Sequence, residues 1–75
     1  IRVFRENVKE EDLIWHRDLK DRSVHVLEGH GWCLQKDNEV PLDLLEGHSY
    51  SIQKMEYHRV VKGTGDLVIR IYEST

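Results

Sequence analysis

Three side chains of types that bind metal ions stand out in this 75-residue chain. His16 and Asp18 lie two residues apart, so in extended backbone both point to the same face. His58 follows forty residues after Asp18, inside the strand-like run 57–61. Two imidazoles and one carboxylate are the ligand set of a facial triad, which leaves half of an octahedral metal open and suits Fe(II). Imidazole and carboxylate together also hold Mn, Co, Ni or Zn.

Short strands are the elements available to position these side chains. Runs that alternate with period two and are rich in β-branched and aromatic residues recur along the chain and indicate strands. These runs are 24–28, 32–35, 42–45, 50–53, 58–61 and 67–72. Their spacing of about 8–12 residues, with Gly, Asp and Asn in the breaks, predicts an all-β sandwich or barrel. In the first run Val24 and Val26 point to one face and His25 to the other.

Composition limits the class of protein and of partner. Leu, Ile, Val and Phe make up 22 of the 75 residues, which is enough for a folded core. A net charge of −3 with both signs interspersed argues against binding to nucleic acid or to an anionic membrane. No apolar run approaches the roughly 18 residues of a membrane span, and no signal peptide is expected. Cys33 is alone, so no internal disulfide can form and the cytoplasm is the default compartment.

The spacing of the first two ligands resembles the first motif of the cupin family, whose fold is a double-stranded β-helix of the jelly-roll type. That motif runs His-x-His, three or four residues, Glu, six residues, Gly, and the corresponding positions here hold His16, Asp18, Arg22 and Gly29. Asp18 replaces an imidazole by a carboxylate, which also binds metals. Arg22 replaces the Glu, and a guanidinium cannot ligate a cation. The resemblance therefore implies three protein ligands instead of four.

The second cupin motif is matched in part. It runs Gly, five residues, Pro-x-Gly, two residues, His, three residues, Asn, and the corresponding positions hold Gly47, Gln53, Met55, His58 and Lys62. The Gly and the His match, whereas the Pro-x-Gly turn is absent. The resemblance extends over roughly residues 15–71 and implies an all-β cupin, a double-stranded β-helix or small jelly-roll barrel.

One domain spanning 1–75 is predicted, with 15–72 as the barrel core and 1–14 as an edge strand or short helix. A helix is expected over 6–13, since Asn7 can cap it and acidic residues stand early in it. The run 1–5 alternates apolar and basic residues, as a pairing strand does. A small jelly roll leaves strand edges exposed, and cupin relatives commonly cover them by dimerising, so a homodimer is expected.

The resemblance implies a pocket that holds one divalent metal ion, either Fe, Mn, Ni or Zn, through His16, Asp18 and His58. A small polar molecule is expected at the open metal positions, and the side chains expected to contact it are Arg22, Gln35, Tyr57 and Trp32. Arg22 has two interpretations: it pairs with Asp18 or Glu28, or it binds a carboxylate or phosphate of the substrate.

Whether the chain is an enzyme stays open, because one scaffold hosts many chemistries. For an enzyme, the resemblance allows an oxygenase-type or isomerase-type reaction with the metal as Lewis acid or oxygen activator. The first alternative is a metal-free module that binds a small ligand such as a sugar. The second is a structural protein with a vestigial site, in which Asp18 pairs with Arg22 and the histidines are only hydrogen-bonded.

Overall fold

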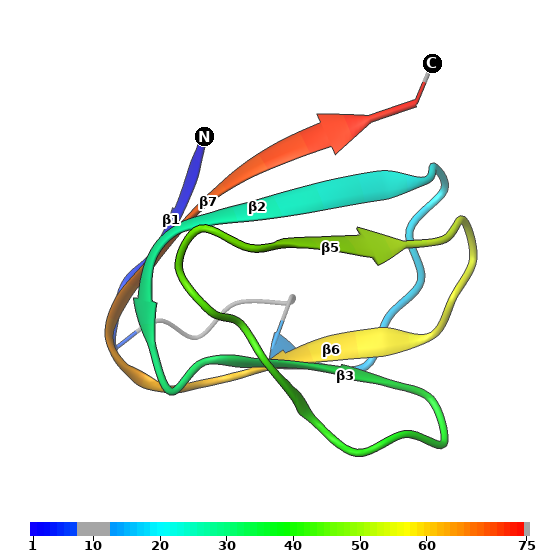
Figure 1. Cartoon of the computed structure of the whole chain (residues 1–75). Coiled ribbons are helices and arrows are strands. Elements are labelled where there is room, and N and C mark those ends of the chain that lie inside the picture. The colour runs from blue at the N-terminus through cyan, green and yellow to red at the C-terminus, as the bar shows by residue number, and fades with distance from the viewer. Residues whose placement is uncertain (8–12, 75) are drawn as a thin grey trace.

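The computed structural model describes residues 1–7 and 13–74, and in these residues the regular structure consists almost entirely of strands joined by turns and loops (Figure 1). The seven strands are β1 (Arg2–Phe4), β2 (Arg22–His30), β3 (Cys33–Lys36), β4 (Leu42–Asp43), β5 (Ser49–Ile52), β6 (His58–Val61) and β7 (Thr64–Glu73). The strand runs predicted from alternation correspond to β2 through β7. Most of the helix predicted over 6–13 falls on residues 8–12, outside the described residues.

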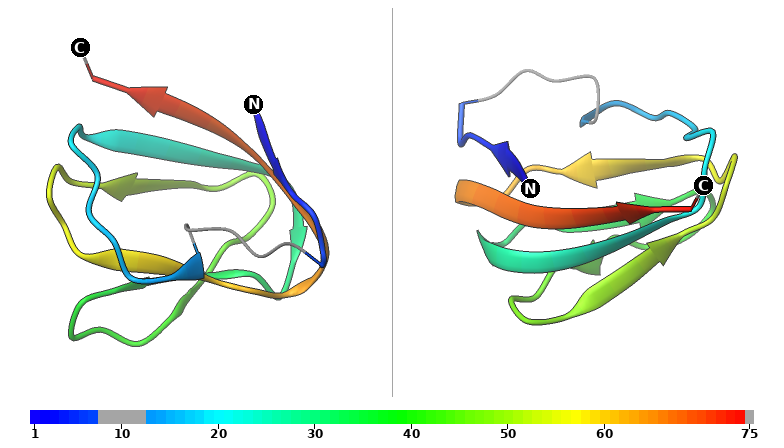
Figure 2. Two further views of the ribbon diagram at one scale, coloured as in Figure 1. Left: turned by 180° about the vertical axis from the view of Figure 1, so that it is seen from behind. Right: turned by 90° about the horizontal axis from the view of Figure 1, so that it is seen from above.

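The strands form two antiparallel sheets, and the view from behind shows β7, β2 and β5 on one side and β6 and β3 on the other (Figure 2). One sheet has the order β1-β7-β2-β5, and the other has the order β4-β3-β6. The two long strands β2 and β7 lie side by side in the first sheet. The register of their pairing shifts between Val26 and Glu28 and again between Glu28 and His30. Such irregularities bend a strand, and they come just before the chain turns from β2 into the second sheet.

The all-β class is confirmed, but the strands do not close a barrel. Closure requires the edge strands of one sheet to pair with those of the other. Within 1–7 and 13–74 no ladder joins the two sheets. The edge strand predicted near the N-terminus is β1, which pairs with β7 at Arg2↔Ile69 through Phe4↔Leu67. The homodimer expected from this edge stays a prediction.

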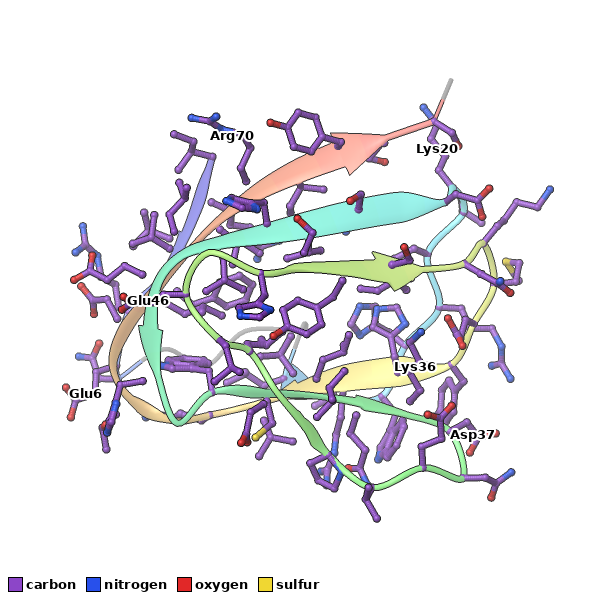
Figure 3. All side chains as sticks on the ribbon, in the orientation of Figure 1. Glu6, Lys20, Lys36, Asp37, Glu46 and Arg70 are labelled. Atoms are coloured by element: carbon purple, nitrogen blue, oxygen red, sulfur yellow. The ribbon has the colours of Figure 1, made fainter. Side chains whose placement is uncertain are left out.

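The core lies between the two sheets and is built from the inward residues of each alternating strand. Val24 and Val26 are buried and His25 is not, as the alternation predicted. Trp32 is fully buried with its ring 6.1 Å from that of Phe4. The remaining core residues are Leu34, Leu44, Ile52, Leu67 and Ile69. Charged side chains, among them the labelled Lys20, Asp37 and Arg70, lie around the outside of the ribbon (Figure 3).

One turn forces a bulky residue into the left-handed region. Met55 has a φ of 65°, and it occupies the position where the cupin motif has Gly. Its amide donates a hydrogen bond of 2.8 Å to the carbonyl of Asp18, so the turn cannot relax without losing that contact.

Replacing this residue by glycine is expected to stabilise the fold. Left-handed φ destabilises a residue that has a side chain by roughly 1–2 kcal/mol, and glycine removes this strain. The greater conformational freedom of Gly in the unfolded chain offsets about 0.5–1 kcal/mol of that gain. We expect Met55→Gly to raise the free energy of unfolding by about 0.5–1 kcal/mol in urea denaturation. Met55→Ala removes the same side chain but keeps the strain, so it should give no gain. Equal effects of the two variants would contradict the prediction.

Candidate metal centre

An isolated bridge between two distant segments brings the two histidines together. The amide of His16 donates to the carbonyl of His58 at 2.9 Å, and the amide of His58 donates back to the carbonyl of His16 at 3.0 Å. Residues directly opposite each other in an antiparallel bridge project to the same side. The two imidazole rings accordingly lie 4.4 Å apart between centroids. This pairing was not predicted from the sequence, since neither position marks its partner.

The carboxylate is placed by a second contact between the same segments. The turn that leads into β6 docks on the segment carrying Asp18, with the amide of Met55 bonded to the Asp18 carbonyl at 2.8 Å. The amide of Lys54 also donates to Oδ1 of Asp21 at 2.7 Å. Asp18 and His58 are buried, with 8% and 2% of their surface exposed. His16, Asp18 and His58 therefore meet at one place, as the ligand prediction requires.

The outer side of the same bridge is held by stacked aromatic rings. Trp15 and Tyr57 each precede one of the histidines and point to the opposite side. Their rings stack at 5.2 Å between centroids, with an interplanar angle of 23°. The guanidinium of Arg17 lies 4.5 Å over the Tyr57 ring, and that of Arg59 lies 5.1 Å over the Trp15 ring. This stack of two rings and two guanidinium groups holds the histidine-bearing segments against each other.

The distances within the cluster match a shared metal ion. Nε2 of His58 lies 3.2 Å from Oδ2 of Asp18, and Nε2 of His16 lies 3.6 Å from Oδ1. Metal bonds of about 2.1 Å place neighbouring ligand atoms about 3.0–3.4 Å apart. All three ligand atoms lie within 4.8 Å of one another, so the widest-spaced atoms would have to draw together through side-chain rotation before all three could bond to one ion.

Both imidazoles are oriented so that a nitrogen lone pair faces the carboxylate. Nδ1 of His16 lies 2.8 Å from the carbonyl of Ile14, and Nδ1 of His58 lies 2.6 Å from the carbonyl of Glu56. A carbonyl only accepts, so Nδ1 is the donor in each ring, and in a neutral imidazole Nε2 keeps its lone pair. Lone pairs directed at a carboxylate repel it. A cation between them, either a metal ion or a proton, makes the contact favourable.

The cluster stands at one side of a small, mostly apolar cavity between the sheets. The cavity measures about 40 Å³, which is room for about three waters at roughly 10–15 Å³ each. Its polar lining residues are His16, Asp18, His58, Arg22 and Arg2, and the other nine are apolar. Arg2 was missed by the sequence analysis, although it lies two residues before the buried Phe4 and so on the same face of β1.

Arg22 lies between two carboxylates and makes no close ion pair with either. Its Nη1 is 3.6 Å from Oδ2 of Asp18, and its Nε is 3.7 Å from Oε2 of Glu73. Among the described residues neither Arg22 Nε nor Asp18 Oδ2 has a hydrogen-bond partner, although both atoms are buried. The expected pairing with Asp18 is thus present as a long contact, and Glu73 takes the place of Glu28. The contact between Arg22 and Glu73 could not be predicted from the sequence, because Glu73 lies at the far end of the chain.

The other three side chains expected to contact a ligand lie away from the cavity lining. Trp32 is fully buried in the core, and its Nε1 donates to the carbonyl of Gly65 at 3.3 Å. Tyr57 belongs to the outer stack. Gln35 donates to the carbonyl of Glu39 at 3.1 Å and accepts a bond of 2.9 Å from Arg59. Of the four predicted contact residues, only Arg22 shares the cavity with the metal ligands.

The single cysteine is unsuited to nucleophilic chemistry. Cys33 pairs with Asp43 across β3 and β4, and its thiol donates to the carboxylate at 3.3 Å. Burial raises the pKa of the Cys33 thiol, and the hydrogen bond to Asp43 and the charge of that residue raise it further.

A raised pKa lowers the thiolate fraction, and the thiolate is the reactive form. We therefore expect an aromatic disulfide reagent to modify Cys33 severalfold more slowly than free cysteine at mildly alkaline pH. Asp43→Asn should speed the reaction, because it removes the charge that disfavours the thiolate. The matched control is Asp37→Asn, which removes a carboxylate from an exposed turn. Equal rates for the two variants would show that Asp43 does not act on the thiol.

Fold and site together define an all-β protein of two antiparallel sheets with a cluster of a half-buried histidine, a buried histidine and a buried aspartate. Compared with known protein families, curated proteins and solved structures, the chain matches none. In residues 1–7 and 13–74 no helix is long and apolar enough to cross a membrane. The function is therefore argued from the side chains of the cluster and its cavity.

Proposed function

We propose that this chain is a small cupin-like protein that binds one divalent transition-metal ion through Nε2 of His16, Nε2 of His58 and the carboxylate of Asp18. The principal support is the orientation of the two imidazoles. Each donates Nδ1–H to a backbone carbonyl two residues earlier and directs Nε2 at the same buried carboxylate. A hydrogen bond to the second ring nitrogen is the usual way in which a metal-binding histidine is fixed.

The donor set limits the choice of metal and its surroundings. Two imidazoles and a carboxylate suit Fe, Mn, Ni or Zn, and three protein ligands leave further positions for water or a small ligand. A metal bound there would supply Lewis acidity, or oxygen activation if it were iron. The protein residues would exclude bulk water, since nine of the cavity-lining residues are apolar. Oxygenase-type or isomerase-type catalysis is part of this proposal only as the chemistry that the site permits.

A second candidate is a metal-free binding module, and the position of Arg22 favours it. The guanidinium already places a positive charge 3.6 Å from Oδ2 of Asp18. In this alternative Arg22 balances the carboxylate, and the cavity holds a small polar molecule directly. Metal binding discriminates between the two candidates.

The test is metal content after loading. Purified protein is treated with a chelator, incubated in turn with Fe(II), Mn(II), Ni(II) and Zn(II), desalted, and analysed for bound metal. We expect one ion per chain for at least one of the four. Protein that retains none of them would contradict the metal proposal and favour the metal-free module.

A further inference from the structure

We propose that the metal-loaded cavity binds a short-chain carboxylate, with the anion shared between the metal ion and Arg22. This inference rests on the proposed metal site and names the class of small molecule that occupies its open positions. It is argued from the charge of the cavity, its size and apolar wall, and the position of Arg22 between the cavity and a surface groove.

The charges around the cavity favour an anion once a metal is bound. Arg22 and Arg2 both line the cavity, and Asp18 and Glu73 are the carboxylates near Arg22. These four groups balance one another. A divalent ion adds two positive charges in surroundings of low polarity, where unbalanced charge is costly. An anionic ligand restores part of the balance, whereas a neutral ligand such as a sugar does not.

Arg22 has a donor for such an anion that no close hydrogen bond occupies. Its Nε is buried and makes no hydrogen bond in the described residues, and Oε2 of Glu73 lies 3.7 Å from it. Nη1 of the same guanidinium lies 3.6 Å from Oδ2 of Asp18, the carboxylate proposed to hold the metal. A carboxylate ligand on the metal would thus lie close to this guanidinium, and charge-assisted hydrogen bonds of this kind are the strong ones.

The size and the wall of the cavity limit the rest of the ligand. A volume of about 40 Å³ leaves room for only a few non-hydrogen atoms beside the metal. The wall beyond the polar cluster consists of aliphatic and aromatic side chains, among them Val24, Ile52 and Ile71. A short alkyl chain fits this wall, whereas hydroxyl groups would be left without partners. Acetate and propionate meet these conditions.

Arg22 stands between the cavity and an open groove on the surface. An open groove runs along the ends of β2, β5 and β7, and Arg22 and Ile52 line both this groove and the cavity. The groove also includes Lys54, whose exposed position is outside the cavity lining. An anion that entered the cavity from this groove would therefore have to pass Arg22 and Ile52.

The test is a titration of Co(II)-loaded protein with acetate and propionate, followed by the visible absorption of the cobalt ion. We expect both anions to change the spectrum and the isosteric acetamide and propionamide to leave it unchanged. Arg22→Gln should weaken carboxylate binding about tenfold or more. The same variant should bind Co(II) at least as tightly as the native chain, because it removes a positive charge beside Asp18. Opposite effects on the two ligands cannot arise from a general loss of structure.

The matched control is Lys54→Gln, which removes the same charge from the groove but not from the cavity. It should change carboxylate affinity much less than Arg22→Gln does. Co(II) binding without any effect of carboxylates, or with equal carboxylate affinity in the native chain and in Arg22→Gln, would overturn this inference alone. Protein that binds neither Co(II) nor any of the four ions loaded above would overturn the metal site and this inference with it.

Discussion

Replacing His58 by alanine is expected to lower the affinity for a divalent metal by on the order of a hundredfold or more, since even loss of a residue that only hydrogen-bonds to a metal ligand costs about 10–100-fold. His58 supplies one of three ligand atoms and is the more deeply buried of the two histidines, with 2% of its surface exposed. Two remaining ligands cannot enclose the ion. Isothermal titration with Zn(II) measures the affinity directly.

Thermal unfolding gives an independent readout of the same loss. A ligand that binds only the folded chain stabilises it by about 2.7 kcal/mol when its concentration is a hundred times the dissociation constant. We expect Zn(II) to raise the midpoint temperature of thermal unfolding of the native chain and to leave that of His58→Ala unchanged. His16→Ala should behave in the same way with less risk to the fold, since 24% of the His16 side chain is exposed.

The matched control is His25→Ala. His25 points away from the core, and its Nδ1 lies 2.9 Å from the hydroxyl of Ser49. This variant removes an imidazole from the chain but not from the cluster, so metal affinity should stay at the native value. A loss equal to that of His58→Ala would show that the ion binds elsewhere or through unspecific surface histidines.

Replacing Gly63 by alanine is expected to cost about 3 kcal/mol or more of stability, which is large beside the roughly 4–11 kcal/mol of a domain of this length. Gly63 lies between β6 and β7, against the turn between β2 and β3. A Cβ atom added there would overlap the carbonyl of His30 and the amide of Trp32. Both are backbone atoms, so a side-chain rotation cannot relieve the overlap, and the two connections between the sheets would have to separate.

The control for backbone freedom is Gly65→Ala. Gly65 has a φ of 67°, but an added Cβ would meet nothing within 4 Å. This variant should cost only about 0.5–1 kcal/mol, because the roughly 1–2 kcal/mol of left-handed strain is partly offset by the smaller freedom of Ala in the unfolded chain. Urea denaturation of both variants measures the difference. If Gly63→Ala were no worse than Gly65→Ala, the close approach of the two connections would not be a determinant of stability.

Alternation predicted much of the fold because it follows from local geometry. The inward direction of Val24 and Val26 and the outward direction of His25 follow from the pleat alone. The same rule applies to neighbours in the site. Because His58 points inward, Tyr57 must point outward, and its stacking on Trp15 confirms this. The alternation of the sequence therefore already indicated that Tyr57 does not line the cavity.

Features that depend on distant pairing could not be predicted. The bridge between His16 and His58 joins segments whose sequences do not specify each other. The approach of Glu73 to Arg22 depends on the register of β7 against β2, which places these two residues opposite each other. The residues of the ligand set were predictable from type and spacing, whereas the charge and the size of the cavity required the packed structure.

The bridge between His16 and His58 would be strengthened by a bound ion. Its two backbone hydrogen bonds join residue 16 to residue 58. An ion held by both rings would act as a reversible crosslink, restricting the chain between these positions in the unfolded ensemble and resisting local detachment in the folded one. Amide hydrogen exchange at these two positions would then report whether the ion is present, with slow exchange in the loaded protein and faster exchange after chelation.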